Sequence, residues 1–472
     1  MRLILSHLSL RTVALLAAAA IALLFFWGLG SVPFLSVNEA RRAVTVREMR
    51  EAGSWLLPYM NGDLYLSKPP FFYWAGLVST AVLGSLSEWS VRLPSALAAT
   101  LCCIGTYLYG VRQAGRQTGL FAVVFLAANG AFSLFARRSE IEMLLTLLCF
   151  GALLAAWHFI FQQGRAVWSR LSYVLLGCAL LTKGPVCLLW VTAPILAYAL
   201  IYRDARAKAY LCDGWGWLIA LVLGGSWYVA VSMNQGWGIW ASIVNEDIVK
   251  KIDGQGAEAW YAYLLYLAGD FFPFWLIVFV QPRRFWAMIR ARREAAMLLC
   301  CSLLPLLIFS CFTEKHGKYL LPIYPSMALL LAMHWAAVFD TAKGRWRACL
   351  ATVPYVMLAG FVVFYMFVEA RVLSHRVGGL EQVATLAAGQ PGQKAYSVGE
   401  PDIRLVYYMG RPVAPLTVAQ LQGANRPVGL LFAQEPLEPE LQGLAACKVG
   451  EVEPYLKPDH AALLVHLAAD CR

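Results

Sequence analysis

Residues 37–75, the most informative part of the chain, read VNEARRAVTVREMREAGSWLLPYMNGDLYLSKPPFFYWA. It lies between a first apolar segment and a chain that otherwise consists mostly of apolar runs. Its carboxylates are Glu39, Glu48, Glu51 and Asp63, and its cations are Arg41, Arg42, Arg47, Arg50 and Lys68. So many charges in one loop beside a membrane indicate that the loop binds or transforms something polar.

The composition is that of a membrane protein. Hydrophobic residues make up 60% of the 472 residues and charged residues 14%, whereas soluble domains carry roughly 25% charged residues. Apolar runs of about twenty residues recur, which is the length that a helix needs to cross a bilayer. The net charge of +11 comes from Lys and Arg placed mainly between these runs. We therefore expect an all-α polytopic membrane protein and no nucleic-acid partner.

Hydropathy predicts eleven spans, within a fold of about 11–13 transmembrane helices. They are residues 12–30, 94–111, 118–136, 142–161, 168–183, 185–202, 214–233, 261–280, 296–312, 319–339 and 348–369. Residues 12–30 have a long apolar core and no clear cleavage site, so we interpret them as a permanent anchor rather than a signal peptide.

Residues 71–87 are the ambiguous twelfth span. If they are not counted and the N-terminus is cytoplasmic, the ordinary basic loops between spans all face the cytoplasm, as the positive-inside rule requires. Residues 38–52 and 71–87 are then predicted to be juxtamembrane helices on the outer face. The same count places several charged segments outside: residues 31–93, 137–142, 183–185, 234–258 with Glu246, Asp247, Lys250 and Lys251, 313–318, and everything after 370. We expect the function on that face.

Hydropathy falls near residue 376, where Gly, Pro and Gln become more frequent. Residues 1–370 are therefore predicted to be the transmembrane domain, with 31–93 as its first outer loop, and residues 371–472 a small soluble α/β domain. The sequence assigns this second domain no chemistry. Cys447 and Cys471 could form a disulfide if the domain faces an oxidising compartment.

Two segments of the first outer loop combine polar groups in patterns that suit a lipid-linked substrate. Asn38 is a good N-cap for a helix that begins at Glu39. Glu39 then either complements the helix dipole and pairs with Arg42, or serves as a base toward an acceptor hydroxyl. Lys68, before Pro69 and Pro70, is either a snorkelling lysine or a cation for a lipid phosphate.

Further charges lie at the ends of later spans. Arg137, Arg138, Glu140 and Glu142 either pair with one another or face a cavity. Residues 314–325 add Lys315, Lys318 and Tyr319, and the lone His316 does not indicate a metal. Asp270 falls inside a predicted span, so it is either functional or a helix-capping group.

These segments together resemble a known family. The runs NEARRA, SKPPFFYW, EWSVRLPSALAA, ARRSEIEMLL, LTKGPV, SWYVAV and KHGKYLLPIYPSMALLLA occur in order within residues 10–370. They resemble the polyprenyl-phosphate-sugar glycosyltransferases of GT-C type, and more narrowly the bacterial lipid A aminoarabinose transferases and the protein O-mannosyltransferases. The resemblance implies a GT-C fold and a sugar donor carried on undecaprenyl or another polyprenyl phosphate.

The resemblance also implies roles for residues. The family's acidic motif is usually Asp-Glu followed by Arg and Tyr, and here these four positions are Asn38, Glu39, Arg41 and Arg42. Because Asn38 replaces the Asp, Glu39 or Glu142 would have to supply the catalytic carboxylate. The family's phosphate-binding lysine matches Lys68, and its second acidic position matches Glu142. Tyr65 and Tyr319 match substrate-pocket positions, and Arg138 is expected beside them.

A leaving phosphate gains charge as it departs, so fixed cations facing it lower the barrier. Lys68 and Arg41, with Lys315 or Lys318, suit that task. A monophosphate donor does not demand a metal, so no cofactor is expected. The expected location is the bacterial inner membrane, with the site and the C-terminal domain in the periplasm. The acceptor would be lipid A, lipopolysaccharide, another glycan or a protein.

Two alternatives remain at this stage. One is a transporter or lipid flippase, although the paired repeats and midplane charges typical of transporters are not found apart from Asp270. The other is a catalytically altered relative, because of Asn38.

Overall fold

The computed structural model describes residues 9–162, 164–240, 258–422, 427–434, 448–452 and 462–467, without the side chains of residues 370, 373–378, 434, 448 and 462–467. Glu246, Asp247, Lys250 and Lys251 lie outside the described residues, as do Cys447 and Cys471 and therefore the disulfide suggested for them.

The chain divides into two compact units. The helical unit comprises Met1–Trp27, Ser67–Phe72 and Pro94–Phe364, and the mixed unit comprises Gly28–Leu66, Tyr73–Leu93 and Tyr365–Arg472. Most of the charged segment 37–75 thus belongs to the same unit as the C-terminal region, whereas Lys68 belongs to the helical unit.

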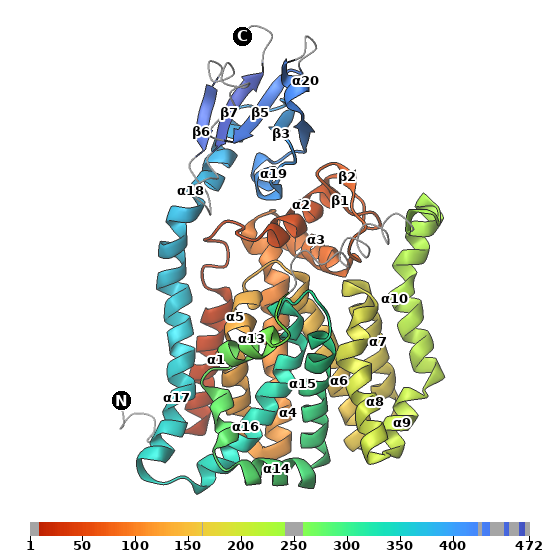
Figure 1. The fold of residues 1–472 in the computed structure, drawn as a ribbon, viewed down its shortest axis with the longest axis vertical. Coiled ribbons are helices and arrows are strands. Elements are labelled where there is room, and N and C mark those ends of the chain that lie inside the picture. The colour runs from red at the N-terminus through yellow and green to blue at the C-terminus, as the bar shows by residue number, and fades with distance from the viewer. Residues whose placement is uncertain are drawn as a thin grey trace. The chain divides into compact units, whose positions relative to one another are not determined.

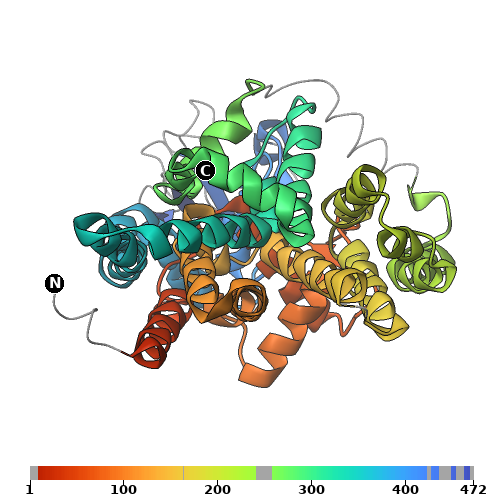
Figure 2. The same cartoon turned by 90° about the horizontal axis from the view of Figure 1, so that it is seen from below.

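The helical unit is built from long apolar helices (Figures 1 and 2). Seven segments among the described residues are long and apolar enough to cross a membrane: Glu88–Ala127, Ile141–Phe161, Pro185–Tyr202, Gly214–Gln235, Arg293–Ser310, Gly317–Thr341 and Gly344–Val368. The predicted helical multi-span architecture is therefore confirmed. The helices of this unit are α1 (Leu10–Phe26), most of α4 (Glu88–Ala127), α5 (Gly130–Ala136), α6 (Ile141–Phe161), α7 (Ala166–Lys183), α8 (Leu188–Tyr202), α9 (Ala205–Leu211), α10 (Gly214–Gln235), α13 (Ala262–Asp270), α14 (Pro282–Ala291), α15 (Arg293–Ser310), α16 (Tyr324–Thr341) and α17 (Gly344–Val363).

Small residues let these helices approach closely. A Cβ on Gly224 of α10 would lie 2.6 Å from the Cβ of Leu180 on α7, and a Cβ on Gly177 would lie 2.8 Å from the Cβ of Leu223. Close backbone contact of this kind is how helices associate in a bilayer, where lipid competes for apolar surface. It explains why α7 packs tightly against α10.

The structure corrects two predicted spans. Residues 118–136 are not one helix, because α4 ends at Ala127 and α5 starts afresh at Gly130, where Asn129 accepts a hydrogen bond from the Phe132 N–H. Residues 261–280 are not continuous either. They form α13 and a 3₁₀ helix, η3 (Phe274–Phe279), separated by Pro273, which cannot continue a helix as its N–H is missing.

In contrast, the break predicted between 94–111 and 118–136 is present within α4. Ala114 and Gly115 leave the helical conformation, and Gly115 has a φ of +87°. Glycine reaches that region without strain, which lets the chain turn between the two arms.

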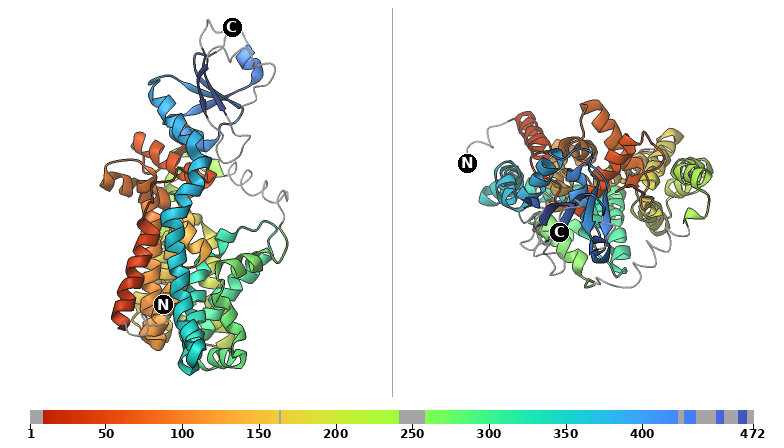
Figure 3. Two further views of the ribbon diagram at one scale, coloured as in Figure 1. Left: turned by 90° about the vertical axis from the view of Figure 1, so that its left-hand side faces the viewer. Right: turned by 90° about the horizontal axis from the view of Figure 1, so that it is seen from above.

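The mixed unit combines the first charged segment with a small sheet. Its helices and strands are α2 (Val37–Glu51), β1 (Tyr59–Met60), β2 (Asp63–Leu64), most of α3 (Phe71–Leu83), α18 (Glu369–Ala388), β3 (Ala395–Val398), α19 (Ile403–Met409), β4 (Val413–Leu416), α20 (Val418–Gln422), β5 (Gly429–Gln434), β6 (Lys448–Val452) and β7 (Ala462–Leu467). The five-stranded sheet has the order β4-β3-β5-β7-β6. Figure 3 shows its strands in blue. Strand β3 is parallel to β4 and β5, and β7 is antiparallel to β5 and β6. The predicted C-terminal α/β region is therefore confirmed.

Both predicted juxtamembrane segments are helical, as α2 and α3. The predicted cap of α2 was wrong, because the helix starts two residues earlier. Ser36 is the N-cap, and its Oγ accepts a hydrogen bond from the Asn38 N–H at 3.1 Å. Asn38 therefore lies in the first turn, half-buried, rather than at the cap.

Candidate functional site

Four charged side chains meet at the ends of helices in the helical unit. We call Glu140, Glu142, Lys183 and Lys318 the four-charge cluster. Lys183 Nζ lies 3.1 Å from Glu142 Oε1, and Lys318 Nζ lies 3.6 Å from the same oxygen and 3.5 Å from Glu140 Oε2. The side chains of Glu140 and Glu142 are only 8% and 5% exposed, whereas that of Lys318 is 21% exposed. The cluster is thus mostly buried, and Lys318 is its most accessible member.

An aromatic wall encloses Lys183. The ammonium lies 4.4 Å from the centre of the Tyr319 ring and 5.9 Å from that of Trp190. The Trp190 indole N–H donates to the Tyr319 carbonyl at 3.1 Å, which fixes the two rings relative to each other. A carboxylate and ring faces around an ammonium group offset part of the free-energy cost of burying it.

The local sequence explains why these groups meet. Glu142 lies in the first turn of α6, and Lys183 is the last residue of α7, so both complement the dipole of their helix. Gly184 ends α7 with a φ of +78°, and a Cβ there would meet only the Tyr228 hydroxyl within 4 Å. Lys318 and Tyr319 lie in η4 (Gly317–Ile323), which leads into α16.

Two neighbouring cations serve the fold. Arg137 is buried and donates to the carbonyls of Leu24 and Trp27, at 2.9 and 2.8 Å, at the end of α1. Lys315 is 4% exposed, and its ammonium donates to the carbonyls of Phe312 and Glu258 at 2.7 and 3.3 Å. The structure thus gives Lys315 carbonyl partners and does not bring it into the four-charge cluster.

The remaining predicted residues of this unit are Lys68 and Arg138. The Lys68 ammonium donates to the carbonyl of Ser67 at 2.9 Å and to its hydroxyl at 3.2 Å. Arg138 is half-buried in the turn between α5 and α6.

In the mixed unit, Glu39 forms a buried ion pair that the sequence did not predict. Arg92 Nε lies 2.9 Å from Glu39 Oε1, and the two side chains are 3% and 0% exposed. The same guanidinium donates to the carbonyls of Leu29, Val32 and Pro33. Arg92 belongs to the EWSVRLPSA run, so the motif contained the signal, but the sequence did not reveal its partner.

Of the other predicted residues in this unit, Arg42 contacts a buried tyrosine. Arg42 is buried and donates to the Tyr73 hydroxyl. Arg41 is half-buried, as is Tyr65, whose N–H donates to the Pro58 carbonyl at 2.8 Å.

A second polar network attaches α2 to the C-terminal part of the mixed unit. The Arg47 guanidinium donates to the carbonyls of Val406 and Tyr407 in α19, at 2.9 and 3.2 Å, and to Glu48 at 3.2 Å. Glu48 in turn accepts the N–H groups of Asn61 and Gly62, at 3.0 and 2.9 Å. The network joins α2, the β1–β2 hairpin and α19 into one unit.

Asp270 lies between an N–H group and a hydroxyl. It accepts from the Ala131 N–H at 3.2 Å and from the Tyr324 hydroxyl. This arrangement links α13, α5 and α16, which agrees with the structural alternative for this residue.

The predicted site residues therefore fall in both units. Glu142, Lys318 and Tyr319 meet in the helical unit together with Lys183, which the sequence analysis did not choose. Asn38, Glu39, Arg41, Arg42 and Tyr65 lie in the mixed unit. Among the described residues, no group of three His, Cys, Asp or Glu side chains is arranged to hold a metal ion.

Comparison with known proteins identifies the class of this fold. Over 98% of the chain, the structure superimposes on 99% of the crystal structure of ArnT from Cupriavidus metallidurans in the apo state, with a TM-score of 0.81 and 20% sequence identity. The structure of the same protein bound to undecaprenyl phosphate gives a TM-score of 0.80 at 19% identity, over 97% of this chain and 98% of that one. The chain is a polytopic membrane protein with the GT-C fold.

Sequence similarity narrows the class. Residues 67–229 match the dolichyl-phosphate-mannose-protein mannosyltransferase family. The undecaprenyl phosphate-alpha-4-amino-4-deoxy-L-arabinose arabinosyl transferase 1 of Sodalis glossinidius is 28% identical over 350 residues, which cover 68% of this chain and 60% of that protein. The protein thus resembles the aminoarabinose transferases and the O-mannosyltransferases. The alignments span 63%, 60% and 59% of the length of three curated relatives that the chain matches.

Proposed function

We propose that the protein is an integral membrane glycosyltransferase that moves a sugar from a polyprenyl phosphate, such as undecaprenyl phosphate, to an envelope acceptor. The relative from Sodalis glossinidius is named as such a transferase, and the similar ArnT structure contains undecaprenyl phosphate. The match to the mannosyltransferase family begins at Ser67 and includes Lys68, Glu142 and Lys183.

The four-charge cluster is the observation that carries this proposal. A departing lipid phosphate becomes a dianion, and prearranged cations in a partly dehydrated site stabilise that charge. Lys183 is held in place by Glu142 and Tyr319, and Lys318 is accessible enough to meet an incoming phosphate. We assign phosphate binding to these two lysines together with Lys68.

The same geometry favours Glu142 as the proton acceptor. In the transfer step, the bond from the sugar C1 to the phosphate oxygen breaks, and its electron pair stays on the phosphate. The acceptor hydroxyl oxygen bonds to C1, and its proton passes to a carboxylate. Glu39 is fully buried against Arg92, so we assign it the task of fixing the start of α2. With Glu142 as the proton acceptor, the reaction does not depend on an aspartate at position 38, where this chain has Asn.

The location and partners belong to the same proposal. The positive-inside pattern supports an outer, periplasmic position for the four-charge cluster and for the C-terminal region in a bacterial inner membrane. The acceptor is lipid A, lipopolysaccharide, another glycan or a protein. We propose that no metal or organic cofactor takes part, because fixed lysines supply the positive charge.

Transfer by the purified protein tests the proposal. The full chain, reconstituted in lipid, is given an undecaprenyl-phosphate-linked sugar and an extract of envelope glycolipids, and the product is identified by mass spectrometry. We expect Lys183→Met to reduce transfer by about 100-fold or more, since one lost contact to a developing oxyanion costs roughly that much. Lys343→Met is the control, because Lys343 is an exposed lysine in a predicted cytoplasmic loop. Equal transfer by the two variants would refute the proposed site.

A further inference from the structure

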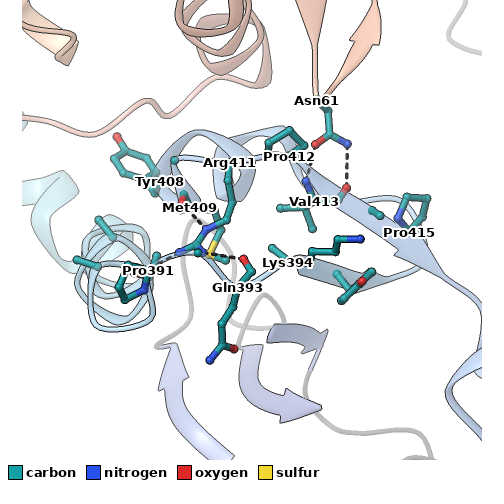
Figure 4. Close-up of a pocket in the computed structure, with 18 of the residues that line it drawn as sticks. Asn61, Pro391, Gln393, Lys394, Tyr408, Met409, Arg411, Pro412, Val413 and Pro415 are labelled. Atoms are coloured by element: carbon teal, nitrogen blue, oxygen red, sulfur yellow. Dashed lines mark hydrogen bonds between the residues drawn. The ribbon is translucent and has the colours of Figure 1, made fainter. Parts of the chain in front are cut away.

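The mixed unit contains a cavity whose lining residues are separate from the four-charge cluster. Its volume is about 1000 Å³, the upper end of the usual range for small-ligand sites. The walls come from the β1–β2 hairpin, the turn after α18, the end of α19 and the strands β3 and β4 (Figure 4). The lining residues that can contact a polar ligand include Asn61, Asp63, Gln393, Lys394, Tyr396 and Arg411.

The charge of this wall favours an anion. Lys394 is exposed, and its ammonium makes no hydrogen bond or ion pair within the part of the chain that the structure describes. Figure 4 shows its side chain extending toward Pro415. The Arg411 guanidinium donates to the carbonyls of Ala387, Gln390 and Gln393, at 2.8, 3.0 and 2.7 Å, so it serves the fold, while its positive charge adds to that of Lys394. The negative charge of Asp63, which also lines the cavity, offsets part of this positive charge.

An extended peptide does not fit the sheet edge that borders this cavity. Strand β4 forms this edge, but Val413 already uses its N–H and its carbonyl with the Asn61 side chain, at 2.7 and 2.9 Å. Pro415 has no N–H to offer. Strand addition, the usual way in which a sheet edge binds a peptide, is therefore blocked here.

The apolar part of the wall suits a sugar ring better than an acyl chain. It consists mainly of Ala, Gly and Pro, which form short, flat surfaces. The Tyr396 ring lines the cavity and packs closely on Gly429, since a Cβ on that glycine would lie 2.8 Å from the ring Cε2. A flat aromatic face with a few polar groups around it is a surface on which a sugar ring can stack.

We propose that this cavity binds an acidic saccharide, with the acid group at Lys394 and a sugar ring against Tyr396. We assign this saccharide to the glycan part of the acceptor, an assignment that rests on the proposed transferase function. The binding itself does not depend on that function.

Binding is tested with the full chain in lipid nanodiscs, without donor lipid. The probes are trigalacturonic acid, neutral maltotriose and an acidic hexapeptide, each titrated by calorimetry. We expect the acidic sugar to bind more tightly than the neutral one, and Lys394→Gln to weaken it about fivefold, as loss of a partly exposed ion pair would. Lys343→Gln is the matched control. Absence of sugar binding, equal affinity in the two variants, or tighter binding of the peptide would overturn the proposal.

The assignment to the acceptor has its own readout. In the transfer assay, Lys394→Gln should raise the KM for an acidic acceptor about fivefold and leave kcat unchanged. If the protein transfers no sugar, the titration still decides whether the cavity binds saccharides. An unchanged KM beside weakened binding would overturn the acceptor role alone.

Discussion

The pair of Glu39 and Arg92 offers a sharp test of what the first charged segment does. Arg92 makes five hydrogen bonds, two to Glu39 and three to the carbonyls of Leu29, Val32 and Pro33. Arg92→Met removes the buried guanidinium from Glu39 and from these three carbonyls. Breaking a buried pair by removing one partner costs about 3–5 kcal/mol. With roughly 2–4 °C per kcal/mol in units of this size, we expect the melting temperature to fall by about 6–20 °C.

The measurement is thermal unfolding of the detergent-solubilised full chain, followed by loss of the monodisperse peak, for Arg92→Met, Glu39→Gln and the double variant. Because the two groups share one interaction, the double variant should be less destabilised than the sum of the single variants. Additive effects, or single variants that melt within about 1 °C of the wild type, would contradict the structural role. If Glu39→Gln abolished transfer without lowering the melting temperature, Glu39 would be the catalytic carboxylate instead.

Two further predictions follow from side chains that make contrasting contacts. Lys315→Met should lower thermal stability with little effect on the KM for the donor, because Lys315 donates to carbonyls. Lys318→Met should raise that KM about tenfold at unchanged stability. The opposite pattern would reverse the two assignments. Burial, together with the Glu88 carboxylate, raises the pKa of the Tyr408 hydroxyl well above its usual range. Its contribution to stability is therefore present at neutral pH and is lost as the pH rises above about 10, the pKa of the unfolded tyrosine, toward the folded value. In thermal melts at alkaline pH, Tyr408→Phe should make the melting temperature depend less on pH between about 9 and 11. An unchanged pH dependence would contradict this.

Hydropathy predicted most of the helices of the helical unit, because the length needed to cross a bilayer sets the hydropathy of long stretches of sequence. The errors arose where a single residue determines where a helix starts or breaks. Pro273 breaks the span that mean hydropathy assigned to residues 261–280, and Ser36 caps α2 two residues before the expected Asn38.

The candidate site was predicted in part. Glu142 and Lys318 were chosen from the charges at helix ends and from family resemblance, and the structure brings them together. Lys183 was not chosen, because a lysine at the end of an apolar run is also typical of the ordinary end of a membrane-spanning helix. Arg92 and Arg47 were missed as partners, because their contacts depend on how the chain folds back on itself. Arg47 and Val406, for example, are 359 residues apart.

The anchoring of α2 by α19 has a consequence for synthesis. Ribosomes release the N-terminal segment first, so Arg47 must wait for nearly the whole chain before its carbonyl partners emerge. Until then its guanidinium and the apolar face of α2, with Val44 and Ala43, lack the neighbours that cover them in the finished molecule. A stop codon or tag inserted before residue 403 should therefore expose an early segment to quality-control proteases, and cleavage would begin near the start of the protein rather than at its shortened end.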